Sequence, residues 1–459
     1  TAPRPEGQIA ALRRAYAQAG FSSATVGLIE AHGTGTVAGD QAEVQALTTY
    51  FDEAGAERQR CAIGSVKSMI GHTKAAAGVA GLTKVALSLY HRVLPPTLGV
   101  TEPNPKANFP SSPFYVNAEA RPWVQGDPSL PRRAGVSSFG FGGTNFHVVA
   151  EEYTGNFLPK DGAVLDPWPA ELFIWRGRSR AEILEATSAL LRKLEQGAQP
   201  RLADLAYTVT LQSGRATDDQ ATLSIVADSM SDLVEKLRTA QTLLQSNAER
   251  QHTPQGIHYA EQPLVAEGQI AFLFPGQGSQ YVNMARDLAV LFPKVRAWFD
   301  QADHVLAERM TPPLSHSIFP PPAFSPEVER LQQAALTETN TAQPALGAVE
   351  VALYHLLRSF GIEPQMVAGH SYAEFVALCV AGCFNEETLL LLSEARGRFI
   401  REGATEESGT MAAIDASPEE LRPLLAGPDV TEANRNAPRQ TVISGARASV
   451  EQAIERCAE

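Results

Sequence analysis

The sequence is poor in cysteine and in positive charge, and it contains no long apolar run. Its four cysteines among 459 residues form neither a disulfide framework nor a paired CxxC zinc motif. Lys and Arg number 38 against 51 Asp and Glu, so the net charge of −13 argues against binding to nucleic acid or to an anionic membrane. No apolar run reaches the ~18 residues of a membrane span, and residues 1–20 lack the apolar core of a signal peptide. We therefore expect a soluble, cytoplasmic, multi-domain protein.

Glycine and proline divide the chain into three α/β blocks, and the 44% hydrophobic content is enough for several cores. Residues 1–152 alternate short apolar segments with glycine turns. Residues 153–267 show strand then helix twice between Pro-rich stretches, carry no catalytic motif, and are predicted to form a small linker domain. Residues 268–459 open with an apolar strand and a glycine loop. From about residue 409 the predicted order of strand, helix, strand, strand, helix is typical of part of a ferredoxin-like fold.

The main motif of the third block is GHSYA at residues 369–373, between an apolar strand and a helix. This is the arrangement of a nucleophile elbow, in which a sharp turn exposes the serine hydroxyl, here that of Ser371. The start of the helix supplies backbone donors for an oxyanion, and Tyr372 is the first candidate. Ala373 stands where glycine is usual. The alternative is an ordinary strand–turn–helix with a buried His370.

A second glycine loop, PGQGSQ at residues 275–280, follows the first apolar strand of the same block. Such a loop is able to place the backbone amide of Gln277 beside Ser371 as the second oxyanion donor. A glycine loop also fits a simple turn. No GxxxxGK[ST] pattern follows it, which argues against a nucleotide phosphate site.

The first block contains two histidines next to glycines. EAHGTGT at residues 30–36 ends a strand in a glycine turn, which leaves His32 to point into a cavity. KSMIGH at residues 67–72 places His72 at the start of a helix rich in small residues, predicted over 71–91. Taken alone, each histidine is also compatible with an ordinary structural role in the core or in a turn. Since no third ligand lies at a suitable spacing, we predict no metal site.

Together with GVSSFGFGGTNFHVV at residues 135–149, these two motifs resemble the C-terminal half of β-ketoacyl synthases, which have a thiolase-like fold. The resemblance implies that His32 and His72 flank a thioester and stabilise the enolate formed when malonyl loses CO₂. It also implies that Lys67 orients the site through a charge network. It assigns Thr34 and Thr36 to hydrogen bonds with the pantetheine arm. It assigns Phe141 to the loop that gates acyl entry.

The Ser371 turn and the Gln277 loop resemble the malonyl-CoA:acyl-carrier-protein acyltransferases of polyketide and polyunsaturated fatty acid synthases. Further matches are QPAL at 343–346, ARGR at 395–398, and NxP with VISG within 436–445. The resemblance implies an α/β-hydrolase-like fold with a ferredoxin-like subdomain, in which Ser371 carries the acyl group. It implies that Arg396 pairs with the free carboxylate of malonyl, a role suited to a planar guanidinium. His370 is a further substrate contact, and the GHSY form resembles that of malonyl-using members.

The whole chain thus resembles the ketosynthase–acyltransferase region of a multi-domain synthase. The implied partners are malonyl-CoA, an acyl carrier protein with its phosphopantetheine arm, and a second copy of the chain through the ketosynthase, with no tightly bound cofactor. The family's ketosynthase cysteine and acyltransferase histidine have no counterpart, because Cys61 lies after His32 and no histidine follows Ser371. Two other classes remain open: a serine hydrolase, against which Arg396 argues, and a non-catalytic scaffold that binds carrier protein.

Overall fold

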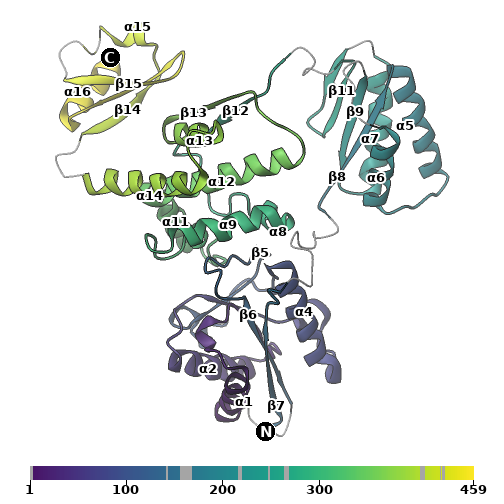
Figure 1. Ribbon diagram of the computed structural model, residues 1–459, viewed down its shortest axis with the longest axis vertical. Helices are drawn as coiled ribbons and strands as arrows, with labels where there is room; N and C mark the ends of the chain where they lie inside the picture. The colour runs from purple at the N-terminus through teal and green to yellow at the C-terminus, as the bar shows by residue number, and fades with distance from the viewer. Residues whose placement is uncertain are drawn as a thin grey trace.

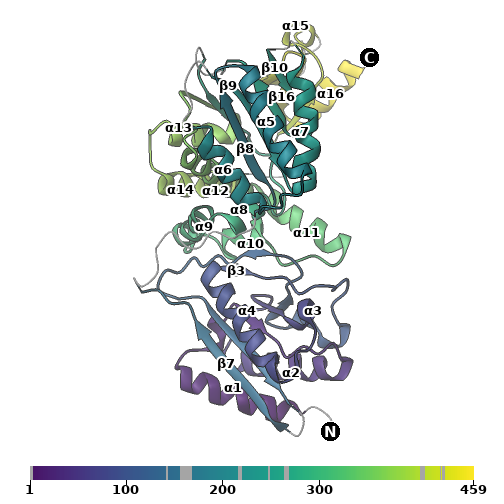
Figure 2. The same cartoon turned by 90° about the vertical axis from the view of Figure 1, so that its right-hand side faces the viewer.

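The computed structural model describes residues 4–140, 143–155, 168–214, 220–246, 249–262, 268–403, 409–423, 425 and 429–458. Figures 1 and 2 show these residues as an N-terminal body (up to residue 155), a linker body (168–262), a central body (268–403) and a C-terminal body (from 409). Each body has buried apolar clusters of its own. None of the described helices is long and apolar enough to cross a membrane.

The N-terminal body is a five-stranded sheet in the order β4-β2-β1-β6-β7, parallel except for β7. The strands are β1 (Leu28–Glu30), β2 (Cys61–Gly64), β4 (Phe114–Val116), β6 (Arg133–Phe139) and β7 (Asn145–Glu151). The helices beside it are α1 (Pro5–Ala19), α2 (Val37–Glu53) and α4 (Ala77–His91). Neighbouring strand residues serve opposite faces, since Ile29 packs with α1 and α2 whereas Leu28 packs with α4. The sheet is therefore covered on both faces, as a parallel sheet requires.

The linker body is an antiparallel sheet in the order β10-β11-β9-β8. Its strands are β8 (Glu171–Gly177), β9 (Ala221–Ala227), β10 (Arg250–His252) and β11 (Ile257–Ala260), and its helices are α5 (Arg180–Glu195), α6 (Leu202–Gln212) and α7 (Met230–Leu244). Every second residue of β9 is buried, which turns one face of the sheet toward the helices. The two predicted strand–helix pairs are present, whereas α6 and the β10–β11 hairpin were not predicted.

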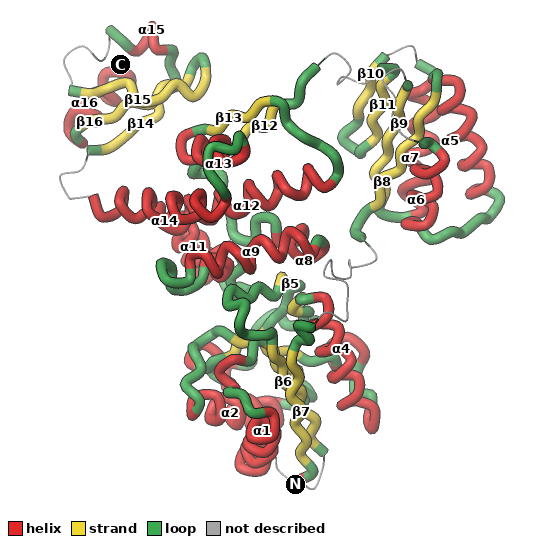
Figure 3. The backbone as a smooth tube through the Cα atoms, in the orientation of Figure 1, coloured by secondary structure: helices red, strands yellow, loops and turns green. Residues whose placement is uncertain are grey.

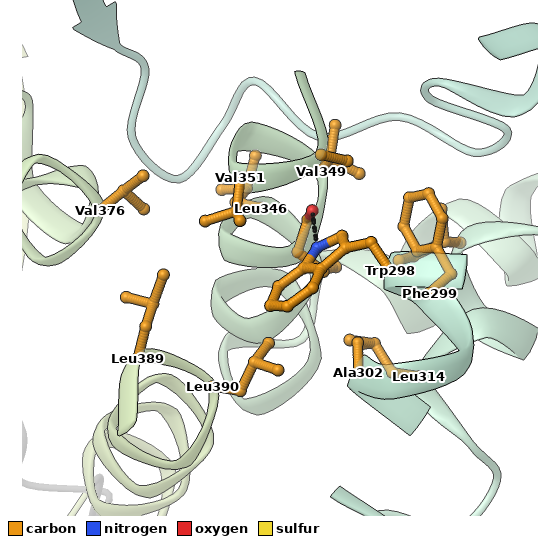
Figure 4. Packing of buried hydrophobic residues seen from close by; sticks show 14 of the residues in the cluster. Trp298, Phe299, Ala302, Leu314, Leu346, Val349, Val351, Val376, Leu389 and Leu390 are labelled. Atoms are coloured by element: carbon orange, nitrogen blue, oxygen red, sulfur yellow. Dashed lines mark hydrogen bonds between the residues drawn. The ribbon is translucent and has the colours of Figure 1, made fainter. Parts of the chain in front are cut away.

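The central body surrounds a parallel pair of strands, β12 (Ala271–Phe274) and β13 (Met366–Gly369). Its helices are α8 (Arg286–Leu291), α9 (Pro293–Leu306), α10 (Leu314–Ile318), α11 (Pro326–Thr337), α12 (Thr339–Ser359), α13 (Glu374–Val380) and α14 (Glu386–Gly403). Figure 4 shows Trp298 and Phe299 of α9 packed near Leu346 and Val349 of α12. The Trp298 indole N–H donates to the Ala348 carbonyl at 2.6 Å. Helix α12 is thus the buried centre of this body.

The C-terminal body is a three-stranded antiparallel sheet in the order β14-β16-β15. Its strands are β14 (Thr410–Ile414), β15 (Val430–Ala437) and β16 (Gln440–Gly445), and its helices are α15 (Pro418–Leu421) and α16 (Arg447–Ala458). Ile443 of β16 packs against Val450 and Ala453 of α16. The order of elements is the one predicted from the sequence.

A buried ion network joins the N-terminal body to the central body. The Arg132 guanidinium donates to both Asp300 carboxylate oxygens at 2.7 Å and to Glu152 at 2.9 Å. Asp300 Oδ1 also accepts the Gln125 backbone N–H at 2.6 Å. The Arg132 side chain is only 5% exposed, so these bonds are shielded from water. The network fixes helix α9 against the strands of the first sheet.

Candidate functional site

The Ser371 turn has the geometry of a nucleophile elbow. Strand β13 ends at Gly369, a short 3-10 turn covers Ser371–Ala373, and α13 follows at once. Ser371 is exposed and has a φ of +57°, a conformation that costs a non-glycine residue energy and that occurs at functional turns. A Cβ atom at Gly369 would collide with the Ala373 carbonyl, so the sharp turn needs glycine there. The predicted exposure of the serine is present.

The glycine loop at 275–280 lies beside this turn because β12 and β13 pair in parallel, with Phe274 opposite Gly369. Figure 3 shows the two strands side by side near α12 and α13. The His370 backbone N–H donates to the Phe274 carbonyl at 3.1 Å and extends the pairing into the turn. The carboxyl ends of both strands therefore meet, as the sequence predicted for the two loops.

The Gln277 side chain is bound by helix α12. Its Nε2 donates to Thr339 Oγ1 at 3.2 Å, and its Oε1 accepts from Gln343 Nε2 at 3.4 Å. Both polar ends of the side chain are engaged, so the backbone N–H of Gln277 is the group left to contact the serine turn. The Tyr372 side chain is likewise turned away from the surface, since it is fully buried. An oxyanion role of Tyr372 therefore also falls to its backbone.

His370 is exposed, and the interpretation that it is a buried core histidine is wrong. Its Nε2 lies 3.1 Å from Asn436 Oδ1 on β15 of the C-terminal body. The histidine before the serine thus links two bodies at the edge of the turn. The sequence motif around Asn436 was visible, but its contact with His370 depends on how the bodies pack.

Arg396 on α14 is a half-exposed guanidinium beside the elbow helix. Its central carbon lies 5.8 Å from the ring centroid of Phe375 on α13. No carboxylate of the described residues forms an ion pair with Arg396, whereas Arg398 pairs with Glu394 at 2.9 Å and with Glu402 at 3.6 Å. Arg396 is therefore available to an incoming anion, and a carboxylate is its best match.

In the N-terminal body, the rings of His32 and His72 lie 5.9 Å apart and perpendicular at 87°. His32 Nδ1 accepts the Phe139 backbone N–H at 3.3 Å, and His72 Nδ1 accepts the Lys74 backbone N–H at 3.1 Å. An accepting Nδ1 assigns the proton of each neutral ring to Nε2. Burial first, and then the nearby charges of Lys67 and His72, lower the His32 pKa to about 4. Each ring thus has its Nε2 left to donate a hydrogen bond.

The predicted helix over 71–91 begins later than expected, at Ala77, so His72 lies in the loop before it. Gly71 and Lys74 have positive φ values, +75° and +56°, and these break the helical path. The small residues of this helix favour packing in the interior, but the helix is buried on one side only, since Val79 is 68% exposed.

Two buried carboxylates that the sequence analysis did not assign hold the His32 turn and its surroundings. Glu43 accepts the backbone N–H groups of His32 and Gly33 at 2.7 and 2.9 Å, and burial raises its pKa to about 7. Glu30 accepts Lys84 Nζ at 2.9 Å, and burial raises its pKa. Burial lowers the Lys67 pKa, and the charges of Glu30 and Glu43 oppose that shift. An acidic residue between the apolar neighbours of α2 was the available signal for Glu43.

A cavity of about 330 Å³ lies beside these groups, and Thr34 and Lys67 are among its lining residues. His32 is not among them, so the structure does not place it in this cavity. Thr34 and Thr36 are exposed, with their hydroxyls 3.2 Å apart. Phe141 lies outside the described residues.

A larger, mostly apolar cavity of about 690 Å³ lies between β12 and α12, with Phe272, Leu346 and Tyr354 in its wall. Glu350 also lines it and is 5% exposed, and neither of its carboxylate oxygens has a hydrogen-bond partner among the described residues. Burial raises the Glu350 pKa to about 8. This carboxyl is therefore protonated at neutral pH.

Glu350→Gln is expected to stabilise the chain more at pH 8 than at pH 5. The folded pKa of Glu350, about 8, lies above its unfolded value, so its contribution to stability is present below the unfolded pKa and is lost progressively as pH rises from that value to about 8. Glutamine removes that ionisation, and the difference in unfolding free energy between variant and parent should grow by roughly 3 kcal/mol from pH 5 to pH 8. Urea unfolding at both pH values measures it, with exposed Glu387→Gln as the control. An equal difference at both pH values would contradict the assignment.

Comparison with known proteins agrees with this geometry. Family models match residues 1–101 as the C-terminal domain of beta-ketoacyl synthase, 103–217 as the ketoacyl-synthetase C-terminal extension, and 271–459 as the acyl transferase domain. The solved acyl transferase domain of ZmaA shares 25% identity with a TM-score of 0.53, covering 64% of this chain and 63% of that one. The site is thus that of an acyltransferase domain joined to part of a ketosynthase, and the predicted α/β fold class is confirmed.

Three relatives match almost the whole of this chain. The chain is 35% identical to the phenolphthiocerol synthesis polyketide synthase Pks15/1 of Mycobacterium marinum, covering 98% of this chain and 20% of the relative. It is 33% identical to a phenolphthiocerol/phthiocerol polyketide synthase of Mycobacterium tuberculosis (100% and 29%). It is also 33% identical to a polyunsaturated fatty acid synthase of Thraustochytrium (96% and 16%). The chain therefore resembles one region of polyketide and polyunsaturated fatty acid synthases, and it spans less than a third of these relatives.

Proposed function

We propose that this chain supplies the malonyl-loading site and the decarboxylation site of a polyketide-type synthase. The observation that carries the proposal is the strained, exposed Ser371 beside a glycine loop, with an arginine free of carboxylate partners among the described residues on the adjacent helix. A nucleophile, backbone donors and a carboxylate receptor are the three elements that malonyl transfer needs. The domain limits at 152 and 267 are part of this proposal.

In the loading step, Ser371 Oγ attacks the thioester carbonyl of malonyl-CoA as its proton passes to a general base. The backbone N–H groups of Tyr372 and Gln277 stabilise the oxyanion, and collapse of the intermediate releases the CoA thiol and leaves a malonyl ester. Arg396 binds the free carboxylate, which simple acyl groups lack, and His370 contacts the bound substrate. The thiol of a carrier protein's phosphopantetheine arm then takes malonyl from the serine.

In the condensation step, the Nε2–H donors of His32 and His72 stabilise the enolate that malonyl forms when it loses CO₂. The low pKa of His32 keeps its ring neutral, and Lys67 acts through the surrounding charges. Thr34 and Thr36 bind the pantetheine arm, and Phe141 gates acyl entry. We propose a cytoplasmic homodimer formed through the ketosynthase, with an acyl carrier protein as partner and no tightly bound cofactor.

The test is the intact mass of the chain after brief exposure to malonyl-CoA. We expect a malonyl adduct on the parent chain and none on Ser371→Ala, because the ester needs the serine hydroxyl. An adduct that persists in Ser371→Ala would overturn the assignment. Absence of any adduct would favour the scaffold, and rapid release of free malonate without carrier protein would favour the hydrolase.

A further inference from the structure

The residue after the nucleophile, Tyr372, ties the elbow to the helix that carries Arg396. The Tyr372 hydroxyl lies 2.6 Å from Ser393 Oγ on α14. The Ser393 hydroxyl donates its own hydrogen bond to the Leu389 carbonyl at 2.6 Å. Ser393 Oγ therefore accepts the hydrogen bond that the Tyr372 hydroxyl donates. Tyr372 and Ser393 are 0% and 1% exposed. A hydrogen bond so far from water is costly to break.

Helix α12 leaves room for this bond. A Cβ atom at Gly347 would collide with the Tyr372 hydroxyl and would lie 3.6 Å from Ser393 Oγ. Glycine at 347 therefore allows the tyrosine hydroxyl to pass α12 and reach α14. Three elements of the central body, namely the elbow, α12 and α14, meet at this one hydrogen bond.

A second contact runs parallel to the first. Arg396 follows Ser393 by three residues, so both side chains lie on the same face of α14. Phe375 follows Tyr372 by three residues, and the two rings lie 6.4 Å apart at an interplanar angle of 22°. The Phe375 ring in turn contacts the Arg396 guanidinium. The distance from the serine turn to the arginine is thus set by two adjacent pairs.

We propose that Tyr372 is a positioning residue that acts through Ser393. The bond between them fixes how far Arg396 lies from the Ser371 turn. The site thereby matches an acyl group whose free carboxylate lies as far from its thioester carbonyl as it does in malonyl. The tyrosine side chain never touches the substrate. This inference rests on the proposed function, and it deepens that proposal by naming what sets the selectivity for a carboxylated acyl group.

The experiment compares acylation of Ser371 by malonyl-CoA and by acetyl-CoA in the whole chain. Tyr372→Phe removes only the hydroxyl, and Ser393→Ala removes only its acceptor. Each is expected to lower the malonyl-to-acetyl ratio of kcat/KM about tenfold, mainly through the KM for malonyl-CoA, since the loss concerns an interaction that acetyl lacks. The double variant should lose no more than either single variant, because all three lack the same bond.

Tyr90→Phe is the matched control, because it removes a hydroxyl from a tyrosine that is 45% exposed. A fall in thermal stability with an unchanged malonyl-to-acetyl ratio would show a purely structural role and overturn the inference. Equal losses for both donors would also overturn it while leaving the proposed function intact. If the parent chain forms no acyl ester on Ser371, the proposed function itself fails. If one variant does not fold, the other still measures the ratio.

Discussion

Arg396→Ala is expected to lower kcat/KM for acylation of Ser371 by malonyl-CoA by about 100-fold or more. The guanidinium has no carboxylate partner among the described residues, so its charge is left for the substrate. A charged, bidentate hydrogen bond to a carboxylate in a partly shielded site contributes roughly 3 kcal/mol, which corresponds to that factor. Initial rates with malonyl-CoA and acetyl-CoA measure the effect, and the acetyl rate should fall far less.

The neighbouring Arg398 provides the control on the same helix. Its guanidinium already pairs with Glu394 and Glu402, so it offers little to an incoming anion. Arg398→Ala should change malonyl kcat/KM by less than about threefold, since the substitution removes no interaction that the substrate makes. Equal losses in the two variants would mean that the net charge of α14 matters, rather than the position of Arg396.

Arg132→Met is expected to lower the free energy of unfolding of the joined N-terminal and central bodies by roughly 3–5 kcal/mol. The substitution leaves the carboxylates of Glu152 and Asp300 without their shared guanidinium, and the Glu152 side chain is only 7% exposed. Asp300 then has no ion-pair partner among the described residues, and Glu152 keeps only Arg92, whose side chain is 42% exposed; a buried carboxylate that loses its main partner costs far more than the pair contributed. The first transition in urea unfolding measures the loss.

The pH dependence of this loss has a defined sign. Burial is the largest influence on the Glu152 pKa and raises it, but Arg132 and Arg92 together outweigh burial and hold the pKa below the ordinary value. The contribution of Glu152 to stability is therefore present above about pH 4.5 and is lost as pH falls through the lowered pKa. The unfolding free energies of the parent and of Arg132→Met should therefore become equal in acid. Arg178→Ala is the control, because its pair with Glu182 is exposed to solvent and should contribute little to stability. A loss as small as that of the control would show that the network does not join the bodies.

Strands and turns were predicted well where the pattern is local. The alternation over Ala221–Ala227 and the apolar run over Thr410–Ile414 each predict a strand from the sequence alone, and both strands have these limits. The QPAL motif predicts a helix that begins at residue 343, whereas α12 begins at Thr339 with Pro344 inside. A proline usually marks the first turn of a helix, and here the helix tolerates it further in. The prolines over residues 312–326 predict a loop, yet this stretch contains helix α10.

The candidate site was predictable as a set of motifs and not as a set of contacts. The elbow at Ser371 follows from glycine and a strand–helix junction, which are local features. The exposure of His370 and the burial of Tyr372 depend on how β13 and α13 pack against α12 and α14. Residue spacing carries no such information. Glu43 was missed for the same reason, because its role is to bind the backbone of a turn eleven residues away.

The Arg132 network has a consequence for the transfer of malonyl between the two proposed sites. Because it joins the first sheet to helix α9, the serine turn and the histidine pair belong to one fixed unit. If malonyl passes from Ser371 to the histidine pair as proposed, a carrier protein would have to move it across the surface of that unit, so the length and freedom of its tether, rather than any hinge near Arg132, would govern how often a loaded malonyl reaches condensation.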